Sequence, residues 1–153
     1  MVYSMARTPD QRAKKWLVPL YNNIGWTYHD QKDYAAALAM FEQALSAAAA
    51  RGQREPVRVA KWAIARCLRS LGRYQEALHR QLILRDDPAL DSAGDGYVFE
   101  EIGENLLALG RATEARSSFA RCPASQSAGA ARWRRLITAK SKSPTAASTF
   151  SDS

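Results

Sequence analysis

The chain has 153 residues and a formal net charge of +7, which is about the length of one domain. Alanine far outnumbers valine and isoleucine, so the composition favours helices over sheets. No window approaches the roughly 18 apolar residues of a membrane span, and residues 1–16 lack the apolar core of a secretory signal. The excess charge lies in residues 1–20 and 123–153, and the neutral middle argues against a nucleic-acid partner.

Seven helices are predicted in chain order, and the predicted fold class is all-α. Pro19 and Pro56 suit the first turn of a helix, where a missing N–H loses no partner, and Pro88 suits a stop. The predicted helices cover residues 10–16, 19–30, 34–50, 56–71, 74–85, 96–109 and 112–121.

Three copies of one pattern divide the middle of the chain. Leu71-Gly72-Arg73 recurs as Leu109-Gly110-Arg111, and Glu-Ala follows each at the same offset. A polar turn around Lys32 marks an earlier copy, at a similar distance before the second. An apolar helical pattern lies on each side of every turn. The unit is therefore a helix hairpin, expected at about 18–51, 56–88 and 96–122.

Small residues recur where the two helices of each hairpin should cross. A side chain larger than alanine there would force the helix axes apart, so we expect these positions to be buried. The predicted crossing residues are Gly25, Ala37, Ala65, Ala77, Gly103 and Ala115.

The hairpins resemble the tetratricopeptide repeat over about residues 18–122. The first copy carries the fullest match: Tyr21, Ile24, Gly25, Tyr28, Tyr34, Ala37, Phe41 and Ala44. The resemblance implies a right-handed α-solenoid of antiparallel hairpins with a concave face. Gln81 departs from it where a large apolar residue is usual, and Ala112 where an aromatic is usual. Because the copies are longer than the family's usual unit, we expect a longer second helix near 47–55 and a longer loop near 86–95.

The two ends of the chain are expected to differ from the repeats. Residues 1–17 form an N-terminal segment. Residues 123–140 hold a candidate capping helix, basic and with Trp133, Leu136 and Ile137 on one side; membrane-surface binding is a weaker alternative for it. Residues 141–153 are expected to be disordered. Three repeats are near the minimum for a stable array, so we expect a piece of a longer array or a homo-oligomer.

No catalytic, cofactor or metal site is predicted. His29 and His79 lie in different repeats without a cysteine at ligand spacing, and a metal site needs three or four converging ligands. Cys67 and Cys122 lie far apart in the chain, which fits neither a disulfide framework nor a zinc pattern, so we expect buried thiols in a reduced, cytoplasmic chain. The glutamates at 100, 101 and 104 are interpreted as a charged helix face rather than an acid–base pair.

A partner-binding stripe is predicted along the first helix of each hairpin, because those helices line the groove in tetratricopeptide-like arrays. Amides bond a peptide backbone, guanidinium groups grip carboxylates and indoles supply apolar area. Segment 51–85 carries +7 and segment 86–122 carries −5, so a ligand of opposite polarity would match. The predicted stripe is Asn22, Trp26, Trp62, Arg66, Arg69, Glu100 and Glu104.

The preferred interpretation is a non-catalytic interaction scaffold that binds a peptide or partner helix in this groove. One alternative is a structural module that self-associates or docks within a larger complex, without a free peptide ligand; an exposed apolar patch at an array end would favour it. A second alternative concerns the charges, since Arg66 and Arg69 would also suit ion pairs with the glutamates of the next repeat. Trp62 could likewise belong to the core between repeats.

Overall fold

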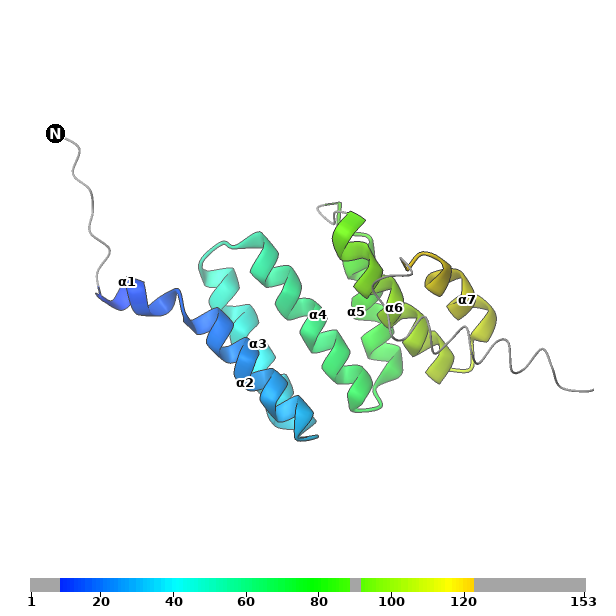
Figure 1. The fold of residues 1–153 in the computed structure, drawn as a ribbon, viewed down its shortest axis with the longest axis horizontal. Helices are drawn as coiled ribbons and strands as arrows, with labels where there is room; N and C mark the ends of the chain where they lie inside the picture. The colour runs from blue at the N-terminus through cyan, green and yellow to red at the C-terminus, as the bar shows by residue number, and fades with distance from the viewer. Residues whose placement is uncertain (1–8, 89–91, 123–153) are drawn as a thin grey trace, which may run out of the picture.

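The structure is a computed structural model, and it describes residues 9–88 and 92–122. Within these ranges the chain is helical and contains no strand, as the composition predicted. Figure 1 shows the helices packed in chain order along one axis. They are α1 (Pro9–Lys14), α2 (Leu17–Asp30), α3 (Tyr34–Ala50), α4 (Arg54–Ser70), α5 (Tyr74–Arg85), α6 (Ser92–Ala108) and α7 (Ala112–Ala120).

Three hairpins are formed by α2 with α3, α4 with α5, and α6 with α7. The two prolines predicted for first turns occupy the third residue of α2 and of α4, where no intrahelical N–H bond is lost. Helix α6 begins at Ser92, before the predicted start, so part of the extra length after Asp86 is helical rather than loop. No helix in the described ranges is both long and apolar enough to cross a bilayer.

Four helix ends share one backbone turn. The residue after the cap has a positive φ at Lys32 (62°), Gly52 (63°), Gly72 (78°) and Gly110 (79°). In each case its N–H bonds a carbonyl three positions back, and the following N–H bonds one five positions back, as in Arg73 to Leu68 at 2.9 Å. This is the Schellman arrangement, and it favours glycine because a Cβ is strained at positive φ. The turn inside the first hairpin differs from the other three in carrying a lysine there.

All six predicted crossing residues are buried. A Cβ placed on Gly25 would lie 2.6 Å from the Phe41 ring, and one on Gly103 would lie 2.6 Å from the Phe119 ring. In the first and third hairpins a ring therefore rests directly on the backbone of the facing helix. Glycine is required at these two sites because any side chain would collide with that ring.

The middle hairpin fills the same position differently. Ala65 and Gln81 stand where the other hairpins have glycine and phenylalanine, and both are 0% exposed. Neither amide atom of Gln81 has a hydrogen-bond partner among the described residues. Gln81, where the tetratricopeptide repeat usually has a large apolar residue, is thus a buried amide on α5. The same helix supplies Leu78 and Leu84 to the apolar core.

The predicted capping helix at 123–140 and the predicted tail at 141–153 lie outside the described residues, as do residues 1–8 of the predicted N-terminal segment.

Candidate partner-binding face

An aromatic row runs across the first helices of the three hairpins. The ring of Trp26 on α2 lies 6.0 Å from that of Trp62 on α4, and Trp62 lies 6.2 Å from Tyr97 on α6. Trp26 is fixed by an edge contact with the core residue Phe41 at 4.9 Å. The Trp62 Nε1 donates a hydrogen bond of 3.5 Å to the Tyr97 carbonyl oxygen. We call the surface that joins α2, α4 and α6 through this row the first-helix face.

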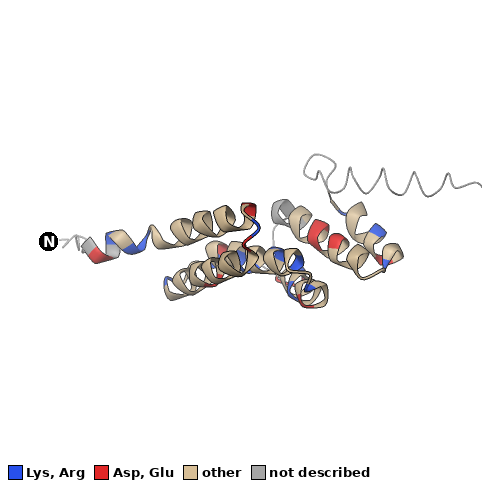
Figure 2. Ribbon diagram, turned by 90° about the horizontal axis from the view of Figure 1, so that it is seen from below, with Lys and Arg blue, Asp and Glu red and all other residues tan. Residues whose placement is uncertain are grey.

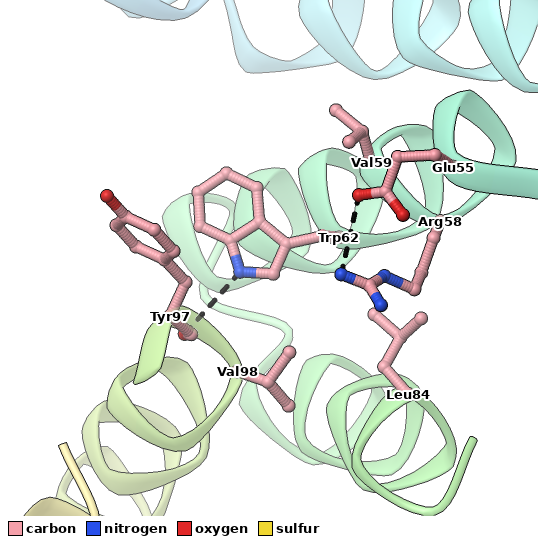
Figure 3. A pocket seen from close by; sticks show the side chains of 7 residues that line it. All are labelled: Glu55, Arg58, Val59, Trp62, Leu84, Tyr97 and Val98. Carbon is pink, nitrogen blue, oxygen red and sulfur yellow. Dashed lines mark hydrogen bonds and ion pairs between the residues drawn. The ribbon is translucent and has the colours of Figure 1, made fainter. Parts of the chain in front are cut away.

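Beside the row lies an apolar pocket of about 360 Å³. Trp62 forms one wall, and Leu84 and Val98 form its floor (Figure 3). Val59 and Tyr97 stand at the rim, where they remain 43% and 50% exposed. A pocket with apolar walls and half-exposed apolar rim residues can take an aliphatic or aromatic side chain from a partner.

The rim of the pocket also carries one ion pair. Glu55 and Arg58, one turn apart on α4, meet at 3.4 Å, and Glu55 remains exposed. These charged groups lie at one end of the pocket, which leaves the wall at Trp62 and Tyr97 apolar.

A polar network ties the three hairpins together next to the aromatic row. Two nitrogens of the Arg69 guanidinium donate to Glu101, at 2.8 and 3.0 Å, and Arg66 meets the same carboxylate at 3.2 Å. Arg66 also donates to the Ser70 hydroxyl at 2.7 Å, and that hydroxyl lies 2.8 Å from His29 Nε2. The network therefore runs from α2 through α4 to α6.

The electrostatics of this network are set by one buried carboxylate. The Glu101 side chain is only 5% exposed, and the two guanidinium groups are its ion-pair partners. Burial opposes the charge of Arg69, but the hydrogen bonds and the charge of Glu101 outweigh it and raise the Arg69 pKa. Burial lowers the pKa of Arg66 and, together with the Arg66 charge, that of His29. His29 is thus held neutral beside the guanidinium groups.

The structure brings together the central part of the predicted stripe. Trp26 and Trp62 are in ring contact, and both are partly buried with one side packed on the core. Arg66 and Arg69 are engaged by Glu101, which was among their predicted alternative partners. The two tryptophans therefore belong both to the face and to the core beneath it.

The remaining members of the stripe lie toward its two ends. Glu100 and Glu104 follow Tyr97 at helical spacing on α6, and their charges help to raise the pKa of Arg69. Asn22 lies on α2 with its Oδ1 buried and, among the described residues, without a hydrogen-bond partner.

The predicted stripe omitted most of the pocket. Leu84 lies on α5, the second helix of the middle hairpin. The stripe was predicted only along the first helix of each hairpin, so it could not include Leu84. Val98 lies next to the predicted stripe in sequence but packs with Leu84 in the core. Of the residues that line the pocket, the predicted stripe contained only Trp62, which forms one wall.

No grouping of three or more His, Cys, Asp or Glu side chains that could hold a metal ion occurs in residues 9–88 and 92–122. His29 is engaged with Ser70, and His79 is exposed on α5. Both cysteines are buried. Burial raises the pKa of Cys67 and, with the charge of Glu100, that of Cys122 to about 11, so neither thiol is activated as a nucleophile.

Comparisons with known proteins agree with this geometry. A family model described as tetratricopeptide repeat matches residues 16–81, which begin just before α2 and end within α5. Comparison with curated proteins and with solved structures gives no match. The third hairpin lies beyond the matched residues but repeats the turn and the glycine–phenylalanine contact of the first. Residues 16–81 therefore contain tetratricopeptide repeats, the helix-hairpin unit of a family of protein–protein interaction modules.

Proposed function

We propose that this protein is a non-catalytic scaffold that binds a peptide or a partner helix on the first-helix face. The observation that carries the proposal is the apolar pocket beside the aromatic row. Trp62 supplies a rigid wall that loses little conformational freedom on binding, and buried aromatic anchors of this kind supply most of the affinity in protein interfaces.

The predicted stripe takes unequal roles in this proposal. Trp26 and Trp62 provide apolar area, and Glu100 and Glu104 give the ligand its orientation through charge. Arg66 and Arg69 hold the face together through Glu101, so a ligand carboxylate would have to displace Glu101 to reach them. Asn22 remains a predicted contact at the α2 end. The ligand we propose is therefore anchored by an apolar side chain and aligned by basic groups.

Site-specific photo-crosslinking tests the proposal. Val59 is replaced by p-benzoylphenylalanine in the full chain, and a second chain carries the same group at Ile83, which is 56% exposed on α5 outside the pocket. Cells expressing each chain are irradiated. We expect discrete cross-linked proteins from position 59, lost when Trp62 is also changed to Ala, and none from position 83. Equal products from both positions would contradict the proposal.

A second candidate function, self-association or docking within a larger complex, is favoured by a separate observation. Trp16 and Leu20, one helical turn apart at the start of the array, are 63% and 51% exposed. Large apolar residues at an array end suit contact with another chain. Light scattering of the full chain and of the Trp16→Ser, Leu20→Ser variant tests this function. A mass above one copy that falls to one copy in the variant would support it.

A further inference from the structure

We infer that the pocket beside Trp62 is occupied by residues 130–140 of the same chain, which makes this segment a built-in competitor of the external partner. The inference rests on the proposed function only in treating the pocket as the binding surface. Four observations carry it: where the described chain ends, how far the next residues reach, which apolar residues follow, and the charge of α6.

The described chain ends at the same end of α6 as the pocket. The Cys122 thiol donates a hydrogen bond of 3.4 Å to the carbonyl of Gly96, and the next residue, Tyr97, stands at the pocket rim. Helix α7 runs antiparallel to α6, so it returns the chain to the first turns of that helix. Cys122 therefore lies beside the first turns of α6, which also supply Tyr97 and Val98 to the pocket.

The following residues are long enough to reach the pocket. Residues 123–129 span at most about 23–25 Å when extended, at roughly 3.3–3.6 Å each. A helix with its side chains is about 10–12 Å across. This length thus suffices to pass over α6 and bring residue 130 to the pocket rim.

Residues 130–140 combine apolar side chains with a charge opposite to that of α6. Trp133, Leu136 and Ile137 follow helical spacing and would share one face. The segment is basic and contains no acidic residue; its charged residues are Arg132, Arg134, Arg135 and Lys140. Helix α6 has the opposite composition, since it carries Glu100, Glu101 and Glu104 and no basic residue. Figure 2 shows acidic residues gathered on α6.

A tethered segment also has an advantage over a free ligand. A short tether gives an effective concentration in the millimolar range, so even a weak contact of Trp133 with the pocket would be well populated. An external partner would then have to displace the segment, and its apparent affinity would fall in proportion to the share of chains whose pocket is open.

Disulfide trapping in the full chain tests the inference. One variant carries Val59→Cys with Leu136→Cys, and the matched control carries Ile83→Cys with Leu136→Cys. A chain with Leu136→Cys alone reports any exchange with the two buried native thiols. We expect the Val59→Cys pair to close within one chain at least tenfold faster than the control pair, at a rate independent of protein concentration.

Two results would overturn it. Equal rates in the two pairs would mean that the segment does not prefer the pocket, as a helix capping the outer side of α7 would predict. Disulfides between chains that form faster at higher concentration would assign the pocket to a second copy.

Thiol labelling provides a second measurement that does not require a disulfide. In a chain with Val59→Cys alone, labelling by iodoacetamide should be at least fivefold slower with the native segment than with Trp133→Ser and Leu136→Ser. Labelling of Ile83→Cys should not change between the two, and circular dichroism confirms that every variant is folded. Unchanged labelling at position 59 would reject the inference, while partner cross-linking from position 59 would still support the proposed function.

Discussion

Giving the middle hairpin the glycine–phenylalanine contact of its neighbours tests how the two helices of a hairpin pack against each other. Gly25 and Gly103 face phenylalanine rings, whereas the middle hairpin has Ala65 and Gln81 at the same two positions. Gln81→Phe alone should place a ring against the Ala65 methyl group. We expect this overpacking to lower the free energy of unfolding by about 1–3 kcal/mol. Removal of the buried amide offsets part of this loss.

Ala65→Gly should relieve that collision. By itself it costs about 1 kcal/mol in helix propensity, plus the burial of one methyl group, about 0.8 kcal/mol. Combined with Gln81→Phe it recreates the contact seen in the first and third hairpins. We therefore expect the two changes to be coupled by about 1–3 kcal/mol in favour of the double variant.

Gln81→Met isolates the contribution of the amide. Methionine keeps the unbranched shape of glutamine and removes two buried polar atoms that lack partners among the described residues. We therefore expect the free energy of unfolding to rise by about 1–3 kcal/mol. Gln75→Met is the matched control, since Gln75 is exposed on the same helix and should change stability by less than about 0.5 kcal/mol.

Urea denaturation followed by circular dichroism measures the native chain and all these variants. Coupling below about 0.5 kcal/mol between positions 65 and 81 would show that these residues do not meet as their counterparts do. A Gln81→Met variant less stable than the native chain would mean that the amide is bonded, for example to a buried water molecule, and would refute the reasoning.

Three further predictions concern the face and the hairpins. Because the folded-state pKa of His29 is lowered, the folded state binds fewer protons than the unfolded one. The contribution of His29 to stability should be complete above the ordinary histidine pKa of 6.5 and should decline as the pH falls below that value. The midpoint of urea denaturation, measured between neutral and mildly acidic pH, should follow this decline. His29→Asn should make the midpoint depend less on pH. Glu101→Gln should cost about 2–4 kcal/mol in urea denaturation, since it leaves two partly buried guanidinium groups without a carboxylate, whereas Glu76→Gln at an exposed pair should cost under about 1 kcal/mol. Gly103→Ala should lower stability by about 1–3 kcal/mol through collision with Phe119, measured by thermal melts.

The sequence predicted the hairpins well because their signals are local. Glycine at the turns, helical spacing of apolar residues and small residues at the crossings all act within one hairpin. The start of α6 was harder, since residues 92–95 are Ser, Ala, Gly and Asp and carry no apolar periodicity. Helix formation there could not be inferred from a spacing that is absent.

The candidate face was predicted only in outline, because its contacts join separate hairpins. Periodicity placed Trp26 and Trp62 on the sides of α2 and α4 that meet in the aromatic row. It could not choose among three neighbouring glutamates, and the choice of Glu101 depends on how α6 is rotated against α4. Leu84 was missed for the same reason, since it reaches the pocket from another helix.

The repeated Schellman turns bear on the order in which the molecule is assembled during synthesis. Each turn is closed by backbone groups that are near neighbours in the chain, so it can form as soon as its own hairpin has left the ribosome. Local closure of this kind favours rapid folding, so the turn of the first hairpin can form before the second hairpin has been made. The contacts of Arg66 and Arg69 must instead wait until α6 has been made. We therefore expect the growing chain to form these turns one by one, and the interaction face only once α6 has left the ribosome.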